Sequence, residues 1–207
     1  MKNNEWIDTM TPLLKKNMAQ ASEEAYKNGC SLIDDAMILF KANRYARTTA
    51  LSVLAEEEFS KAFILTICQE QDRWDSTIFK SLTRHSEKQG IAEAMRSYFE
   101  WFLNNFKNIM ESNRNSAIPA QSAIYPGEAF MEKNLGMARS RFKKPIKDYM
   151  KQEGFYVGVT RKAEIKSLPS SISESHAKLT LEEANTFKII TEISVGNYDN
   201  VATLFES

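Results

Sequence analysis

The sequence predicts an all-α protein, built of long helices with one short β-like segment. Turn-forming residues are scarce, with 7 glycines and 5 prolines among 207 residues, while apolar side chains recur at helical spacing over much of the chain. Few stretches alternate apolar with polar residues, which disfavours a many-stranded sandwich. Because this length suits one sizeable core, we expect a single domain over residues 1–207 with its core at about 11–195.

The first half of the chain predicts four helices. Pro12 suits the first position of a helix, where its missing N–H costs nothing. Gly29 is a place where that first helix could be irregular, and Asp75 is a favourable N-cap for the third. The four expected ranges are about 12–39, 45–68, 75–88 and 91–110.

The second half predicts a loop, two helices and the β-like run. Residues 113–127 contain Pro119, Pro126 and Gly127 and indicate a loop. A further helix is expected from Glu128 to about Gln152, kinked at Pro145. The β-like run is 155–159, and a polar stretch follows it through residue 169. The segment Thr180-Leu-Glu-Glu resembles a capping box that opens a last helix to about residue 195.

Composition and charge exclude several classes of protein. The 27 basic and 27 acidic residues balance, so binding to nucleic acid would need a local basic patch. No stretch approaches the roughly 18 to 20 apolar residues of a membrane span, and the N-terminus lacks a signal-peptide pattern. We therefore expect a soluble, cytoplasmic protein. Cys30 and Cys68 lack metal-ligand spacing and are expected to be buried, reduced thiols.

The expected second helix carries charges where its pattern predicts burial. On a helical wheel, Glu57 and Lys61 lie within an apolar arc, and Glu58 lies between leucines at 51 and 65. Charges are costly to bury unless they are paired, so Glu57 and Lys61, at i and i+4, are expected to pair. The pair could fix helix packing or a dimer contact. Alternatively, it could form a polar centre in a cleft, with Lys61 available for a phosphate.

Three cations surround one of the two histidines. Lys80, Arg84 and Lys88 flank His85, and this grouping suits acid–base work on a phosphodiester because the cations would attract phosphate and favour a neutral imidazole. The alternative is a solvated basic turn with an idle histidine. His176, the other histidine, lies in a polar, serine-rich stretch and is expected at the surface.

A second basic group precedes the β-like run and could track an RNA backbone. The alternative is a solvated helix face. Its members are Arg139, Arg141, Lys143, Lys144, Lys147 and Lys151.

Several cofactor chemistries lack their signatures. Neither histidine has an acidic residue three positions before it, as a di-iron bundle requires. The chain also lacks a Walker loop, a glycine-rich dinucleotide turn, zinc-ligand spacing and a nucleophile elbow. We therefore expect no metal and no cofactor.

Three segments together resemble the AbiV family of abortive-infection proteins. Residues 45–62, YARTTALSVLAEEEFSKA, are similar to the family's Ala-x-x-Leu followed by Glu-Glu-x-x-Lys-Ala. The segment from His85 to Lys88 resembles its His-x-x-Lys. Tyr156-Val157 resembles a Tyr-Val element that precedes the family's C-terminal helix. The similarity runs from about residue 34 to residue 190.

The resemblance implies an antiparallel, HEPN-like helical bundle that dimerises and acts in defence against phage. Many HEPN proteins are metal-independent ribonucleases whose site combines an arginine with a histidine that follows after four to six residues. In this sequence Lys80 stands at that offset from His85, with four residues between them. Lysine supplies the charge but not the bidentate fork of arginine.

Two functions remain open from the sequence. The first is an RNA-cleaving effector in which His85 moves protons, Lys61, Lys80, Arg84 and Lys88 contact phosphate, and Glu57 or Glu58 orients these cations. A phage-encoded component would release this effector from an inactive state. The second is a non-enzymatic binding module that acts through dimerisation and contact with another protein.

Overall fold

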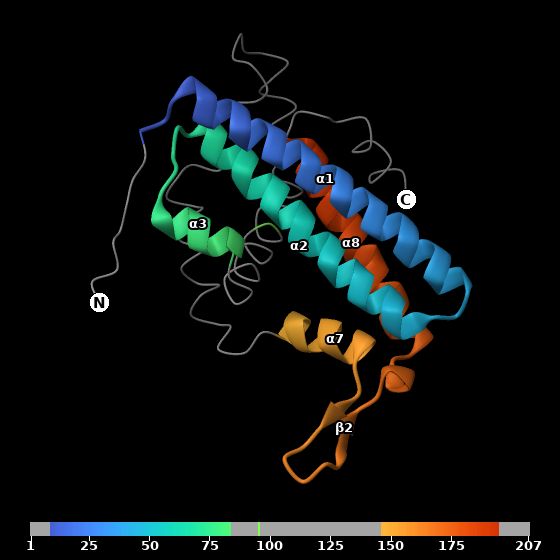
Figure 1. The fold of residues 1–207 in the computed structure, drawn as a ribbon. Helices are drawn as coiled ribbons and strands as arrows, with labels where there is room; N and C mark the ends of the chain where they lie inside the picture. Colours follow the sequence, from blue (N-terminus) through green and yellow to red (C-terminus); the bar gives the residue numbers. More distant parts are fainter. Residues whose placement is uncertain (1–8, 84–94, 96–145, 195–207) are drawn as a thin grey trace, which may run out of the picture.

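Three long helices lie side by side and form the body of the structure, a computed structural model that describes residues 9–83, 95 and 146–194 (Figure 1). Helix α1 spans Pro12–Lys41, α2 spans Tyr45–Glu70 and α8 spans Glu174–Ser194. Helix α2 packs against both of the others and against α7, which spans Ile146–Phe155. The prediction of an all-α architecture is confirmed.

The start of α1 follows from its sequence. The Thr11 hydroxyl accepts a hydrogen bond from the amide of Leu14 at 3.1 Å, and Pro12 occupies the first turn. After α1, Asn43 adopts a left-handed conformation with φ of 58°, which asparagine tolerates better than most residues. This tight connection turns the chain back, so α1 and α2 form an antiparallel pair (Figure 1).

Gly29 does not interrupt α1, so the expected irregularity is wrong. A Cβ atom at this position would lie only 2.7 Å from the ring of Phe59 on α2. Phe59 is fully buried, and its ring also lies against Tyr26, with the ring centroids 5.8 Å apart. Glycine is needed here because α1 and α2 approach closely, not because the backbone bends.

Helix α3 spans Ser76–Thr83 and begins where the sequence predicts. The Asp75 carboxylate accepts a hydrogen bond from the amide of Ile78 at 2.9 Å and so caps the helix. Ile78 is buried in the core, and Leu82 packs against it. The rest of the predicted helix 75–88 lies outside the described residues, as do the predicted helix 91–110 (Met95 apart), the loop 113–127 and the helix 128–152 before residue 146.

A small hairpin and one turn of 3-10 helix connect α7 to α8. Strand β1 (Gly158–Val159) pairs antiparallel with β2 (Ile165–Ser167), with Gly158 opposite Ser167, and Pro169–Ser171 form the 3-10 turn. The expected β-like run 155–159 is thus half right, because Phe155 still belongs to α7. Strand β2 lies in the polar stretch that follows this run.

The start of α8 corrects another expectation. Helix α8 begins at Glu174, where the Ser173 hydroxyl accepts a hydrogen bond from the amide of His176 at 3.2 Å. Thr180, the expected cap, is instead a buried residue of the second turn, and its hydroxyl donates to the carbonyl of Ala177 at 3.0 Å. The serine at 173 is an equally good cap, and it adds almost two turns to the helix.

The core centres on α2. Its Phe59 and Phe63 pack with Phe187, Ile190 and Ile193 of α8. The buried, free thiol of Cys68 joins this core, and burial raises its pKa to about 12; Cys30 is also free but only half-buried. The expected burial therefore holds for Cys68 and is wrong for Cys30. Among the described helices, none is long and apolar enough to cross a membrane.

Gly29→Ala is expected to destabilise the protein by about 1–2 kcal/mol. The overlap with the buried Phe59 ring costs about 1–3 kcal/mol as overpacking, which outweighs the helix-propensity gain of up to about 1 kcal/mol. Urea unfolding followed by circular dichroism measures the difference. Asn28→Ala, at the exposed neighbouring position, is the control and should be neutral or slightly stabilising. A Gly29→Ala protein as stable as wild type would contradict the close packing of α1 on α2.

Candidate polar site along helix α2

Three consecutive glutamates on α2 point in three directions, because successive side chains of a helix are about 100° apart. Glu56 is only 2% exposed and continues a buried line with Ser52 and Ser60, four residues to either side of it. Glu57 and Glu58 are half-buried. The expected burial of this helix is confirmed, and each acidic residue meets a different environment.

Glu57 forms an ion pair with Lys151 of α7. The Lys151 Nζ lies 2.9 Å from the Glu57 Oε1, and the two side chains are only 12% and 15% exposed. The expected pairing of Glu57 with Lys61 is therefore wrong. Local spacing suggested it, but α7 approaches α2 closely enough to supply a cation from 94 positions further along the chain.

Lys61 pairs with Glu58 instead. The Lys61 Nζ lies 2.5 Å from the Glu58 Oε1, with the side chains 31% and 18% exposed, at i and i+3 on the same helix. This carboxylate fixes the position of the ammonium group. Of the two glutamates in question, Glu58 is thus the one that orients Lys61, while Glu57 connects α2 to α7.

A buried carboxylate that sequence reasoning missed lies on α8. Glu192 is 4% exposed and accepts a hydrogen bond of 2.5 Å from the Tyr26 hydroxyl of α1. Burial and this hydrogen bond raise the pKa of Tyr26. Lys188, one turn earlier, lies 4.0 Å from the same carboxylate oxygen. The flanking Ile190 and Ile193 were the sequence signal for its burial.

Lys80 lies in the last turn of α3, where it is half-buried. The helix is held by its Asp75 cap and by the two apolar residues that pack on the core. Lys80 makes no ion pair with any described residue. Its predicted companions Arg84, His85 and Lys88 lie outside the described residues.

The second basic group is described only at its end. Arg139, Arg141, Lys143 and Lys144 lie outside the described residues, and Lys147 is placed only as a backbone position in α7. Lys151, the last member, is largely buried in its pair with Glu57. This part of the group is therefore not a solvated face.

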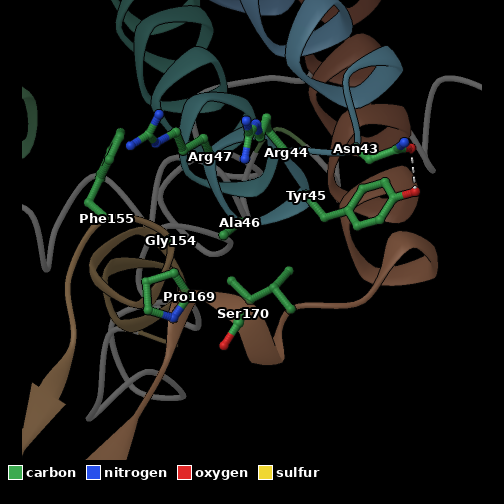
Figure 2. Close-up of a pocket in the computed structure, with 10 residues that line it drawn as sticks. Asn43, Arg44, Tyr45, Ala46, Arg47, Gly154, Phe155, Pro169 and Ser170 are labelled. Atoms are coloured by element: carbon green, nitrogen blue, oxygen red, sulfur yellow. Dashed lines mark hydrogen bonds between the residues drawn. The ribbon is translucent and has the colours of Figure 1, made fainter.

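A pocket that sequence reasoning missed lies at the N-terminus of α2. It has a volume of about 660 Å³ and lies between the start of α2, the end of α7 and the 3-10 turn (Figure 2). Arg44 and Arg47 belong to its α2 side, and Pro169 and Ser170 lie across from them (Figure 2). Its sequence signal was a pair of arginines three residues apart at a helix start.

The described residues contain no group of three or more histidine, cysteine, aspartate or glutamate side chains that could hold a metal ion. Glu57, Glu58 and Glu192 instead interact with lysine or tyrosine side chains. The arrangement supplies fixed cations and buried hydrogen-bonded carboxylates, which can position a phosphate or hold helices together.

One comparison with known proteins identifies a family. A HEPN-type family model described as AbiV matches residues 17–189, which is most of the chain. Neither the curated proteins nor the solved structures contain a significant match. The matched range includes α2 and α3 completely, together with all but the last turn of α8.

Replacing Lys151 with methionine is expected to destabilise the protein by roughly 3 kcal/mol, because the Glu57 carboxylate would remain in a largely dry environment. Lys61→Met is the matched control. The Lys61–Glu58 pair is more exposed and lies within one helix, so the free energy of unfolding should fall by only about 0.5 kcal/mol. Urea unfolding of Glu57→Gln, of Lys151→Met and of the double variant Glu57→Gln/Lys151→Met gives the coupling energy between the two side chains. Equal losses for the two lysine variants would contradict the structural role of the Glu57–Lys151 pair.

Proposed function

The chain belongs to the AbiV family of HEPN-type abortive-infection proteins, and on this premise we propose that it is an RNA-cleaving effector that arrests growth of the infected cell. The observation that carries the proposal is the position of Lys80. Lys80 lies in the last turn of α3, a helix that packs on the core, and it forms no ion pair with a described residue. It precedes His85 by five positions. A cation and a histidine at this offset are the two groups that metal-independent RNA cleavage needs.

The chemistry assigned to the site is transesterification. His85 accepts the proton of a ribose 2′-OH, whose oxygen attacks the adjacent phosphorus. The new 2′-O–P bond forms as the bond to the 5′-oxygen breaks. The leaving oxygen takes up a proton from water, and the protonated His85 returns its proton to solvent. Lys80 steadies the charge that develops on the phosphorane. The products are a 2′,3′-cyclic phosphate and a 5′-hydroxyl end.

The remaining charged residues have supporting roles in the proposal. Lys61, fixed by Glu58, and the cations Arg84 and Lys88 contact neighbouring phosphates. Glu57 acts indirectly, by holding α7 against α2 through Lys151. The basic residues that precede α7 follow the RNA backbone. The site is completed in a homodimer, and a phage-encoded component releases its activity.

The β-hairpin favours a second candidate, the non-enzymatic binding module. Several of its apolar side chains are exposed: Tyr156 is 68% exposed, Val159 62% and Ile165 64%. Apolar side chains gathered at a surface are typical of protein–protein contacts. In this alternative, growth arrest follows from sequestration of a partner.

His85→Ala is expected to abolish phage protection and growth arrest, because His85 is the group that accepts the 2′-OH proton in the proposed mechanism. The measurement is plating efficiency and growth after infection, with expression and folding of each variant verified. His176→Ala is the matched control: it removes the other histidine, which is exposed in the first turn of α8, and should leave protection intact.

Protection that survives His85→Ala would contradict the ribonuclease proposal. If Val159→Ser/Ile165→Ser then abolished protection while the protein stayed folded, the binding module would be supported instead. A monomeric protein in light scattering would contradict a cleavage site that is completed in a homodimer.

A further inference from the structure

The pocket at the start of α2 presents two cations, Arg44 and Arg47. Arg44 and Arg47 are exposed and lie at i and i+3, and neither forms a hydrogen bond or ion pair through its guanidinium with a described residue. Lys61, Lys151 and Lys188, by contrast, each lie within ion-pair distance of a carboxylate. Two neighbouring guanidinium groups repel each other. An anion bound between them would offset this electrostatic repulsion.

The described residues that line this pocket include no carboxylate. Glu174 of α8 accepts a hydrogen bond from the Tyr45 hydroxyl at 3.1 Å and is directed to that side chain. Tyr45 also donates to Asn43 at 2.9 Å (Figure 2). Tyr45, Asn43 and Glu174 are thus hydrogen-bonded to one another, while the guanidinium groups of Arg44 and Arg47 have no such bond with a described residue.

The shape of the pocket depends on a close helix contact. A Cβ atom at Gly154 would overlap with the carbonyl oxygen of Ala46 and lie 2.7 Å from the Cβ of Ala50, so only glycine allows α7 to end against the first turn of α2. Its neighbour Phe155 is 41% exposed and forms part of the wall. In Figure 2 the Arg47 side chain extends toward Phe155. An aromatic ring beside an arginine is a suitable surface for stacking a nucleobase.

We propose that this pocket binds a nucleotide unit, with its phosphate between Arg44 and Arg47 and its base against Phe155. A volume of about 660 Å³ is within the usual range for small-molecule sites. Arginine binds phosphate through two parallel N–H groups, so the two arginines of the lining suit a phosphate. The ligand is either a free nucleotide or a 5′-phosphorylated end of RNA, since both present the same chemistry.

The site is separate from the residues assigned to RNA cleavage. It lies at the N-terminal end of α2, whereas α3 and Lys80 follow the C-terminal end (Figure 1). A helix of 26 residues is roughly 39 Å long. Nucleotide binding here does not depend on the proposed ribonuclease activity, and a binding assay on a His85→Ala protein tests it independently.

The test is equilibrium binding of three probes by calorimetry: AMP, adenosine, and a short single-stranded RNA with a 5′-phosphate. Each is titrated into His85→Ala protein, which prevents cleavage of the RNA in the proposed mechanism. We expect AMP or the RNA to bind, adenosine to bind at least about tenfold more weakly, and Arg44→Gln/Arg47→Gln to lower affinity for the phosphorylated probe at least about tenfold. Tighter binding of AMP identifies a free nucleotide as the ligand, and tighter binding of the RNA identifies an RNA end.

Arg161→Gln is the matched control, because this arginine is also exposed but lies in the hairpin turn away from the pocket. It should leave the affinity unchanged. Arg47→Lys, which retains the charge but loses the bidentate fork, should weaken binding to an intermediate degree and serves if the double variant does not fold. The proposal is overturned if neither phosphorylated probe binds, if adenosine binds as well as AMP, or if the arginine variants bind like Arg161→Gln.

Discussion

Helix α2 is buried on nearly every side, yet it carries three consecutive glutamates and a lysine. The rest of the structure depends on how these charges are stabilised away from water. Desolvating a charge without a partner costs several kcal/mol. The structure meets the constraint by bringing α7 across α2 so that Lys151 reaches Glu57, and by turning Lys61 back onto Glu58. The first of these contacts joins α2 to α7, whose end forms one side of the pocket.

Small residues make the same architecture sterically possible. Gly29 accommodates the Phe59 ring between α1 and α2, and Gly154 lets α7 end on the first turn of α2. Ser22 serves a similar purpose, because its hydroxyl donates to the carbonyl of Ala62 at 2.9 Å across the α1–α2 contact. Helix α2 separates two regions of the molecule. Its C-terminal end leads to α3 and Lys80, and its N-terminal end presents Arg44 and Arg47.

The features that the sequence predicted well are local ones. Proline at position 12 and aspartate at 75 each act within one helical turn, so the starts of α1 and α3 could be derived from residue type alone. Burial of α2 followed from apolar residues in nearly every direction around the helix. These properties require no knowledge of what packs against the helix.

Features that depend on tertiary contacts could not be derived in this way. The partner of Glu57 comes from a helix far along the chain, and the interaction between Tyr26 and Glu192 joins residues 166 positions apart. At the start of α8, Ser173 and Thr180 were both suitable caps, and the packing of Thr180 in the core decides between them. The pocket was missed because Arg44 and Arg47 acquire a common surface only when α7 and the 3-10 turn close its other sides.

We propose that His85 and Lys80 cleave RNA when infection triggers the protein. The most direct measurement is the sequencing of RNA 3′ ends from phage-infected cells, with selective capture of 2′,3′-cyclic phosphates. New cyclic-phosphate ends should accumulate after infection in cells with the wild-type protein and be absent with His85→Ala. Identical RNA ends in the two strains, with phage protection retained in both, would contradict the account and favour a protein that acts by binding alone.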